Sequence, residues 1–286
     1  MPSARTAQRL SLYALAVVLA TIVSSPVYAS DPKEELAELE KRFGMVVQHE
    51  DFKFPFDTPN GKVQGKNAAL KDVERYLPLF KKELAKFPKD IFRKLGVKRV
   101  VLCTGLAWEK QPRAAVPELC TMTFFLDVRL GRETKNYQER VVHHDFFHFI
   151  DWMDDSSYDD SAWKRLNPKG FKYGTGGADM QGGAEDVFSA RDDLPGFLTK
   201  YSTSGVEEDK AEIYSFLMTN HRFVAGRMEA DKIIVEKVRL LKKLLQSCHR
   251  AYDAAFWKSI EKATLPEQPE DQEQEEDEEE DETDAG

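Results

Sequence analysis

The pattern of apolar and polar positions predicts helices and strands in the N-terminal half of the chain. Between Ala68 and Phe87 an apolar residue recurs every three or four positions, which is typical of a helix with one buried face, and Pro88 follows its end. Asp31 to Phe43 is a short charged segment that we expect to be helical. Met45 to Phe56 has an alternating and aromatic character, and this pattern predicts a strand.

Two further apolar runs, Lys98 to Cys103 and Leu119 to Val128, are interpreted as buried strands. The segment between these two runs contains Pro112 and Pro117 and is expected to be a loop. Helical periodicity returns from Tyr137 to Trp152, directly after an asparagine of the type that often caps the start of a helix.

The C-terminal half begins with a long irregular segment, Asp154 to Pro195, that is rich in glycine, aspartate and aromatic residues. Loops of this length in a compact domain are usually functional or disordered. Glu207 to Phe223 is predicted to be helical, and Asp231 to Phe256 is predicted to be one long helix with a single apolar stripe. The order of these elements predicts an α+β domain in which helices pack on a small mixed sheet.

The first 29 residues have the features of a secretory signal peptide. Arg5 and Arg9 precede an apolar run, Leu10 to Val23, and Val27-Tyr28-Ala29 supplies small residues at a cleavage site. A spanning helix needs about 20 apolar residues, and this run is shorter. We therefore expect a protein that is secreted or periplasmic, with no stable membrane anchor.

The last residues, Glu267 to Gly286, include 13 aspartates or glutamates and no lysine or arginine. Such a composition cannot bury enough apolar surface to offset chain entropy, so we expect a disordered acidic tail. The tail also accounts for the net charge of −9, because the rest of the chain carries +4 and, without its two N-terminal arginines, about +2. A nearly neutral domain from residue 30 to 266 argues against nucleic acid as a partner.

Three cysteines remain in the expected domain, at positions 103, 120 and 248. An odd number leaves at least one cysteine without an intramolecular partner. Cys103 and Cys120 lie in or next to the two expected strands and could form a disulfide, which in an exported protein would contribute about 3 kcal/mol. Three buried, reduced thiols explain the sequence equally well.

The residues capable of chemistry are concentrated in the expected helix 137–152. Its central string, from 141 to 151, reads Val-Val-His-His-Asp-Phe-Phe-His-Phe-Ile-Asp. Residues four apart lie on the same face of a helix, so His144 and His148 can direct two imidazole rings at one ion. His143 points about 100° away around the helix and is interpreted as structural. Two buried histidines without partners would be costly among so many apolar residues, which favours a metal site.

Asp145 stands where the H-E-x-x-H motif of zinc hydrolases has its glutamate. In such a site three protein ligands leave one position on the metal for water. The metal acidifies that water, and a carboxylate accepts its proton as the water attacks a carbonyl. Asp145 keeps the carboxylate, but its side chain is about 1.5 Å shorter than that of glutamate. It can therefore act as the general base only if the metal or the backbone lies closer than in a site with glutamate.

A third ligand must come from elsewhere in the chain, and the acidic string Glu207 to Tyr214 is the candidate. Glu208 and Glu212 share one helix face, so one carboxylate could bind the metal while the other accepts a hydrogen bond from a ligating histidine. A solvated helix face that pairs with lysines explains the string equally well. The residues alone leave the roles of the two glutamates open.

Together, the strings 144–148 and 208–212 resemble those of bacterial zinc-binding metallopeptidases of gluzincin type. The connecting segment is also similar to that family in Trp163-x-x-Leu166-Asn167-Pro168-x-Gly170-Phe171-x-Tyr173-Gly174 and in Val206-Glu207-Glu208-Asp209. The resemblance covers roughly Leu119 to Met218. It implies a zincin-like fold and a Zn²⁺ ion, with a peptide or protein as substrate.

The resemblance also implies roles for individual residues. His144 and His148 match the two histidine ligands, and Glu208 best matches the downstream glutamate ligand. The family has a glutamate as general base, and the departure at Asp145 puts turnover in doubt more than metal binding. We expect Glu212 and Asp151 to support the ligands from the second coordination sphere.

Asp154 is a competing candidate for the third ligand. It lies ten residues after His144, where a metzincin-type motif places its last ligand. That motif needs a glycine three positions after its second histidine, and Asp151 stands there. The comparison favours Glu208, because a second helix can present its carboxylate without an abrupt turn.

The expected function is that of an exported zinc-dependent hydrolase, most simply a peptidase. The substitution of Asp145 for glutamate keeps a second reading open, a catalytically silent module of zincin fold that binds metal or a peptide. A developing oxyanion could accept a hydrogen bond from Tyr201, Tyr214 or His221. Packing explains each of these residues more simply. The sequence does not indicate the oligomeric state.

Overall fold

The computed structural model describes residues 31–129, 135–155, 160–180 and 186–264. Contacts group Pro32 onward into one compact unit. The expected signal peptide, 1–29, and the expected acidic tail, 267–286, lie outside the described residues. None of the helices in the described part of the chain combines the length and the apolar composition that a membrane span requires.

The described residues form a small sheet of seven strands and ten α-helices, so the expected α+β class is confirmed. The N-terminal half contains α1 (Pro32–Phe43), β1 (Val46–Gln48), β2 (Phe56–Thr58), β3 (Gly61–Asn67), α2 (Leu70–Ala85), α3 (Ile91–Leu95), β4 (Arg99–Trp108), β5 (Gln111–Pro112), β6 (Ala115–Glu118) and β7 (Thr123–Asp127). The C-terminal half contains α4 (Lys135–Asp155), α5 (Ser161–Lys164), α6 (Gly177–Met180), the 3₁₀ turn η1 (Tyr201–Thr203), α7 (Val206–Thr219), α8 (His221–Ala230), α9 (Lys232–Cys248) and α10 (Ala254–Ala263).

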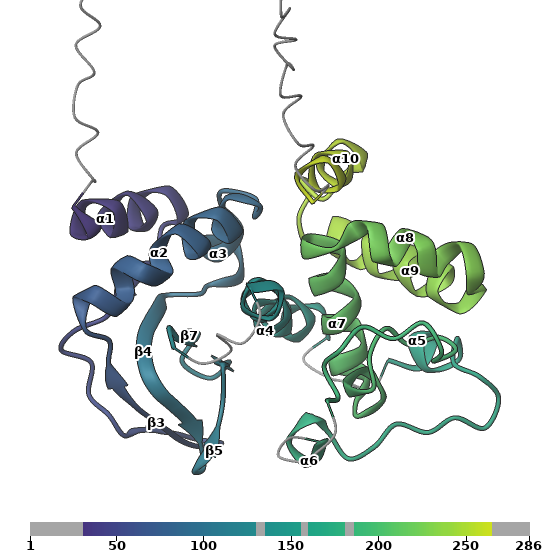
Figure 1. Ribbon diagram of the computed structural model, residues 1–286, viewed down its shortest axis with the longest axis horizontal. Coiled ribbons are helices and arrows are strands. Elements are labelled where there is room, and N and C mark those ends of the chain that lie inside the picture. The colour runs from purple at the N-terminus through teal and green to yellow at the C-terminus, as the bar shows by residue number, and fades with distance from the viewer. Residues whose placement is uncertain (1–30, 130–134, 156–159, 181–185, 265–286) are drawn as a thin grey trace, which may run out of the picture. The chain divides into compact units, whose positions relative to one another are not determined.

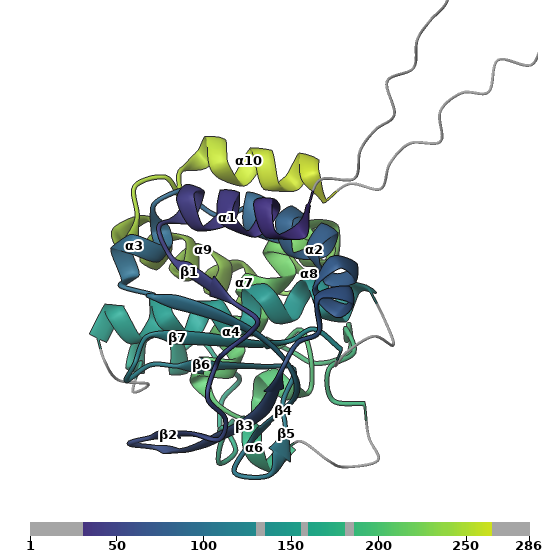
Figure 2. The same ribbon diagram turned by 90° about the vertical axis from the view of Figure 1, so that its left-hand side faces the viewer.

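The sheet has the strand order β2-β3-β4-β7-β6, and β1 and β5 pair with the long strand β4. β4 runs parallel to β1 and β7, whereas β3 and β5 are antiparallel to it. β6 is antiparallel to β7, with Val116 opposite Phe125, and ends this path as an edge strand. Figure 2 shows β7 and β6 running side by side next to α4.

The two faces of the sheet are buried by different parts of the chain. Along β4, Val100 and Leu102 belong to the main core, which the helices share. Val101 and Cys103 point to the other face and pack in a second cluster with aromatic residues that include Phe52. This alternation follows from the two-residue period of a strand, and it explains why the apolar run has no polar face.

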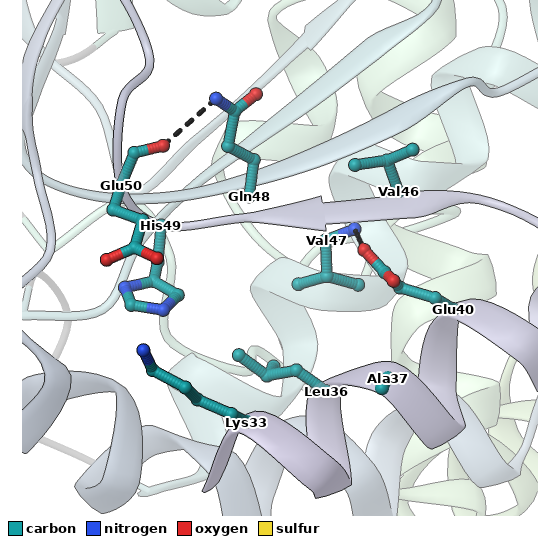
Figure 3. Close-up of a pocket in the computed structure, with 9 residues that line it drawn as sticks. All are labelled: Lys33, Leu36, Ala37, Glu40, Val46, Val47, Gln48, His49 and Glu50. Carbon is teal, nitrogen blue, oxygen red and sulfur yellow. Dashed lines mark hydrogen bonds between the residues drawn. The ribbon is translucent and has the colours of Figure 1, made fainter.

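Edge strand β1 is shorter than the expected strand from Met45 to Phe56. The chain turns after Gln48, and Asp51 has a φ of 57°, a left-handed conformation that ends regular pairing. Helix α1 protects the outer edge, because the backbone amide of Val47 donates to Oε1 of Glu40 at 2.8 Å (Figure 3). A side chain that occupies an outward donor makes the edge less available to another strand.

Other expectations about helices and strands were also wrong. The proline-containing segment expected to be a loop includes β5 and β6, and Pro117 pairs with Phe124 because an edge strand tolerates a missing amide donor. The expected single helix Asp231 to Phe256 is two helices. α9 ends before His249, which is extended, and the carboxylate of Asp253 accepts from the amide of Phe256 to start α10.

The helix expected at 207–223 also divides, because Asn220 leaves helical geometry and caps α8 through the amide of Phe223. All three cysteines are free, with Cys103 buried and Cys120 exposed.

Figure 1 shows α4 between the strands β4 and β7 on one side and helix α7 on the other. The contacts agree, since α4 packs on both α7 and β6, so the helix that carries the histidines is enclosed.

Candidate metal centre

Helix α4 presents two histidines on one face while the rest of the helix is held in the core. Val142, Phe146 and Phe149 are fully buried against the sheet and the helices around it. His144 and His148 are one turn apart, with ring centroids 5.3 Å from each other. The apolar faces therefore fix the rotation of α4, and that rotation points both imidazoles in one direction.

Helix α7 brings a carboxylate to these two rings. Oε2 of Glu208 lies 2.9 Å from Nε2 of His144 and 3.7 Å from Nε2 of His148. One ligand atom from each of the three residues lies within 4.8 Å of the others, so the group could hold a metal ion. The side chains of Glu208 and His144 are only 12% and 11% exposed, so the three atoms converge in a mostly enclosed space.

These distances fit a zinc ion. Zn²⁺ binds imidazole nitrogen and carboxylate oxygen at about 2.0–2.2 Å in tetrahedral geometry, which places neighbouring ligand atoms about 3.3 Å apart. The observed separations of 2.9 and 3.7 Å bracket this value. Two nitrogens and one carboxylate are a donor set typical of catalytic zinc, and they leave the fourth position for water.

The two histidines have different electrostatic environments. Burial disfavours the charged form of His144, but the carboxylates of Glu208 and Glu212 outweigh burial and raise its pKa to about 10. Burial lowers the pKa of His148 to about 4. Without metal, His144 is therefore an imidazolium and His148 a neutral ring at neutral pH.

Glu212 lies one turn beyond Glu208 and faces the other nitrogen of His144. Its Oε1 atom is 2.9 Å from Nδ1 of His144, and its Oε2 atom is 3.8 Å from Nη1 of Arg140. A carboxylate behind a ligating histidine sets the orientation and basicity of the ring. Sequence reasoning missed Arg140, although its position four residues before His144 puts it on the same helix face.

Asp145 lines a cavity of about 370 Å³ next to His144. Burial raises the pKa of its carboxyl group to about 7, which the charge of His144 opposes and that of Glu208 reinforces. A carboxyl group with a pKa near the working pH can both accept and return a proton. Asp145 therefore lies beside His144 and in contact with space that a substrate could enter.

Asp151 lies at the contact between α4 and α7. Its Oδ1 atom accepts a hydrogen bond of 2.8 Å from Nζ of Lys210, which also lies 3.1 Å from Asp160. Asp151 and Lys210 are both buried. This ion pair joins the two helices that carry the ligands, so the visible contribution of Asp151 is to hold those helices together.

The residue after Glu208 anchors helix α7 in a buried network. Oδ2 of Asp209 accepts hydrogen bonds from Trp163, Tyr173 and Lys237, at 2.7, 2.6 and 2.6 Å. Trp163 and Tyr173 belong to the connecting segment that resembles the metallopeptidase family. That segment thus fixes the first turn of α7, where the ligand Glu208 stands.

Other candidate residues lie away from the three ligand atoms. Nε2 of His143 is 2.7 Å from Oε2 of Glu83, and both side chains are fully buried, as expected for a structural residue. Asp154 is exposed near the end of α4 and is absent from the ligand group found among the described residues. The hydroxyl group of Tyr214, in the core, lies 3.2 Å from that of Tyr252.

Tyr201 is part of the site, although from the sequence a role in packing was the simpler explanation for this residue. Its hydroxyl group donates to Oε1 of Glu208 at 3.1 Å, which leaves Oε2 toward the histidines. A Cβ atom on Gly177 would lie 2.0 Å from that hydroxyl oxygen and 2.3 Å from Oε1 of Glu208, so a side chain here would displace Tyr201 or Glu208.

Comparisons with known proteins agree with this geometry. Residues 120–259, just under half of the chain, match the model of a family described as "Putative zinc-binding metallo-peptidase", which confirms the resemblance and extends it toward the C-terminus. The matched segment contains His144, His148 and Glu208.

The fold is similar to the crystal structure of "a putative zinc-binding metallo-peptidase" from Bacteroides caccae ATCC 43185. The TM-score is 0.51 at 16% identity, over 82% of this chain and 94% of the other. At this identity the likeness concerns the fold. Among curated proteins, none matches the chain.

Proposed function

We propose that this chain, whose metal-site segment matches a zinc-binding metallopeptidase family, is an exported zinc-dependent peptidase. His144, His148 and Glu208 hold the zinc ion, and Asp145 is the general base. The observation that supports the proposal most directly is the convergence of Nε2 of both histidines on Oε2 of Glu208.

When bound, zinc supplies an acidified water and polarises the substrate carbonyl group. The task of Asp145 is to accept the proton of that water and return it to the leaving amine. Burial raises the pKa of Asp145 above that of an ordinary aspartate, which favours a carboxyl group that can take up a proton. Its side chain is shorter than glutamate by about 1.5 Å, so the base works only with a water held close to α4.

The neighbouring residues position the ligands. Oε1 of Glu212 lies 2.9 Å from Nδ1 of His144, so it would hold the proton of the ring on Nδ1 and leave the lone pair of Nε2 to the metal. Tyr201 occupies Oε1 of Glu208, so the other carboxylate oxygen is directed at the ion. In other metal sites, the loss of such partners typically lowers affinity or activity about 10- to 100-fold.

The substrate class and the location of the protein are part of this proposal. A peptide or protein is the partner expected from the family resemblance, and the nearly neutral charge of the domain gives no support for nucleic acid. The N-terminal segment has the composition of a signal peptide, which supports export to the periplasm or beyond.

Elemental analysis of the protein that begins at Ser30 tests the metal. We expect close to one zinc per chain after mild purification, and His144→Ala or His148→Ala should lose most of it. His221→Ala is the matched control, because His221 starts α8 and is outside the ligand group of the described residues. Wild-type protein without metal even after zinc soaking would refute the proposal.

The aspartate at position 145, where zinc hydrolases have a glutamate, supports a second candidate function. In that case the protein has the same fold and binds metal or a peptide, but it has no catalytic activity. The zinc site would then be intact and the base ineffective. Assays with a broad mixture of peptides distinguish the two, because only the enzyme produces new amino termini. Cleavage that depends on zinc and on Asp145 supports the peptidase.

A further inference from the structure

The cavity of about 370 Å³ beside the metal centre has a composition that indicates which side chain it accepts. We call it the α4 cavity. His144 and Asp145 form part of its lining, so a group in the cavity lies directly beside the atoms proposed to react. Its other walls come from β5, the start of β6, the first half of α4 and the segment around Phe188.

One wall of the α4 cavity is a continuous row of aromatic rings. The ring of Tyr137 meets that of Phe188 edge to face, with centroids 5.5 Å apart. The Phe188 ring lies 4.7 Å from that of Tyr201, which in turn lies 5.7 Å from the ring of His144. The row therefore leads from the far end of the cavity to a metal ligand. Aromatic rings prefer to meet other rings in such tilted or edge-to-face geometry.

This aromatic wall is held in place before any ligand arrives. Nη2 of Arg140 donates to the backbone oxygen of Phe188 at 2.8 Å, and the amide of Tyr201 donates to the oxygen of Val187 at 2.9 Å. The amide of Phe188 is bound to the carboxylate of Asp186 at 3.1 Å. A wall that is already ordered loses little entropy when it binds a side chain.

Another part of the lining consists of small side chains. Pro112, Ala114 and Ala115 line the cavity together with the three aromatic rings. Ala115 is buried in edge strand β6, and Ala114 precedes it with its oxygen bound by the amide of Asp127. Small side chains at these positions leave space in the cavity for a large group.

Charged groups of both signs line the α4 cavity. Two guanidinium groups, Arg113 and Arg140, and two carboxyl groups, Asp145 and Glu212, line it. Arg140 is engaged with Glu212 at 3.8 Å, and Nη2 of Arg113 is bound to Oε1 of Gln111 at 2.7 Å. Either a carboxylate or an ammonium group would therefore meet a like charge, whereas a neutral ring would not.

We propose that the α4 cavity binds an aromatic side chain of the substrate next to the scissile peptide bond, and that this cavity selects the cleavage site. The inference rests on the proposed function, because it names the substrate class of the same metal site.

Two series of peptides test the selection. One varies the residue before a defined peptide bond and the other varies the residue after it, with Phe, Ala, Asp or Lys at that position. We expect Phe to raise kcat/KM about 10- to 100-fold over Ala in one series, as expected for burial of a large apolar side chain. Equal cleavage of the Phe and Ala peptides, or a preference for Asp or Lys, would overturn the inference.

Variants locate the selection in the cavity. Ala114→Phe should narrow the α4 cavity and bring the ratio of kcat/KM for the Phe peptide over the Ala peptide close to one. Phe188→Ala should reduce the preference by opening the aromatic wall. Phe223→Ala is the matched control, because Phe223 is a partly buried ring that packs on Phe216 outside the cavity. An unchanged preference in both cavity variants would contradict the assignment.

Binding to the zinc-loaded protein separates failure of this inference from failure of the proposed function. The probes are two peptide hydroxamates that differ only in a benzyl or a methyl side chain beside the hydroxamate. The benzyl compound should bind at least about 10-fold more tightly, and this result supports the cavity assignment even if no peptide is cleaved. Equal binding, or no binding of either compound, overturns the assignment whether or not peptides are hydrolysed.

Discussion

Nε2 of His144 and Oε2 of Glu208 lie 2.9 Å apart, on helices that are separated by more than 50 residues of chain. Because Glu212 faces the other nitrogen at 2.9 Å, the metal-free ring stands between two carboxylates. This arrangement explains why the pKa of His144 is raised to about 10. A zinc ion must displace the proton that the two carboxylates hold in place.

Zinc binding should therefore release protons, and its affinity should rise with pH up to about 10. The raised pKa keeps His144 protonated below that value, whereas a ligating histidine must be neutral. At pH 8.5 His148 and Asp145, with pKa values of about 4 and 7, have already lost their protons. Calorimetry at pH 8.5 in buffers of different ionisation enthalpy should show at least one proton released per zinc. A release near zero would contradict the charged state of His144.

Glu208 and Asp154 should differ sharply in their importance for zinc. Glu208→Ala removes a ligand atom and should weaken zinc affinity at least as much as the loss of one histidine. Asp154→Ala should change affinity little, because Asp154 is exposed near the end of α4. Competition with a zinc chelator measures both variants. The reverse result, with full affinity in Glu208→Ala and lost affinity in Asp154→Ala, would favour the metzincin-like ligand set.

Removing the carboxylate behind His144 should weaken zinc binding without abolishing it. Glu212→Gln keeps the size of the side chain but loses the charge that orients and polarises the ring, so affinity should fall about 10- to 100-fold. Glu207→Gln is the control, since Glu207 is in the same helix and outside the ligand group among the described residues. Equal affinities for the two variants, from the same chelator competition, would show that Glu212 has no role at the metal.

Substitutions of Asp145 should separate chemistry from metal binding. Asp145→Asn should keep zinc and abolish hydrolysis, because the amide cannot accept the proton. Asp145→Glu should hold or raise activity by restoring the usual reach. Zinc content and peptide cleavage are measured on the same preparations. If wild type and Asp145→Asn are equally inert and Asp145→Glu gains activity, the protein is a binding module.

The buried pair below the ligand Glu208 should be important for folding stability. Lys237→Met leaves the carboxylate of Asp209 without its cation in a fully buried position, and such a loss costs about 3–5 kcal/mol. Lys243→Met, on the exposed side of the same helix, should change the free energy of unfolding by less than about 0.5 kcal/mol. Urea denaturation of the zinc-free proteins compares the two. A similar small effect for both would show that Asp209 is stable without the pair.

Features that depend on neighbours in sequence were predictable. The apolar periodicity located α2, α4 and α7 within a few residues, because a helix places residues three and four apart on one face. The same rule placed His144 and His148 together. The class of fold followed from the order of such elements, and the match of residues 120–259 confirmed the family resemblance.

Breaks within polar or mixed segments were harder to foresee. Asp231 to Phe256 has one apolar stripe, yet the chain leaves the helix at His249 and restarts at Ala254. Nε2 of His249 lies 2.9 Å from a carboxylate oxygen of Asp90, a residue far away in sequence. A contact of this kind has no signature in the local pattern of the helix.

The choice of the third ligand and of its supporting residues also depended on distant contacts. The sequence places Glu208 and Glu212 on one face of a helix and does not distinguish their roles. The packing of α7 on α4 distinguishes them, because Glu208 lies at Nε2 of His144 and Glu212 lies at Nδ1. Two further residues contact these glutamates. Tyr201, in the 3₁₀ turn η1, donates to Glu208, and Arg140, one helical turn before His144 in α4, lies close to Glu212. Local spacing specifies the direction of a side chain within its own helix. The distance between atoms on two helices depends on how their buried faces pack, and this packing involves residues throughout the core.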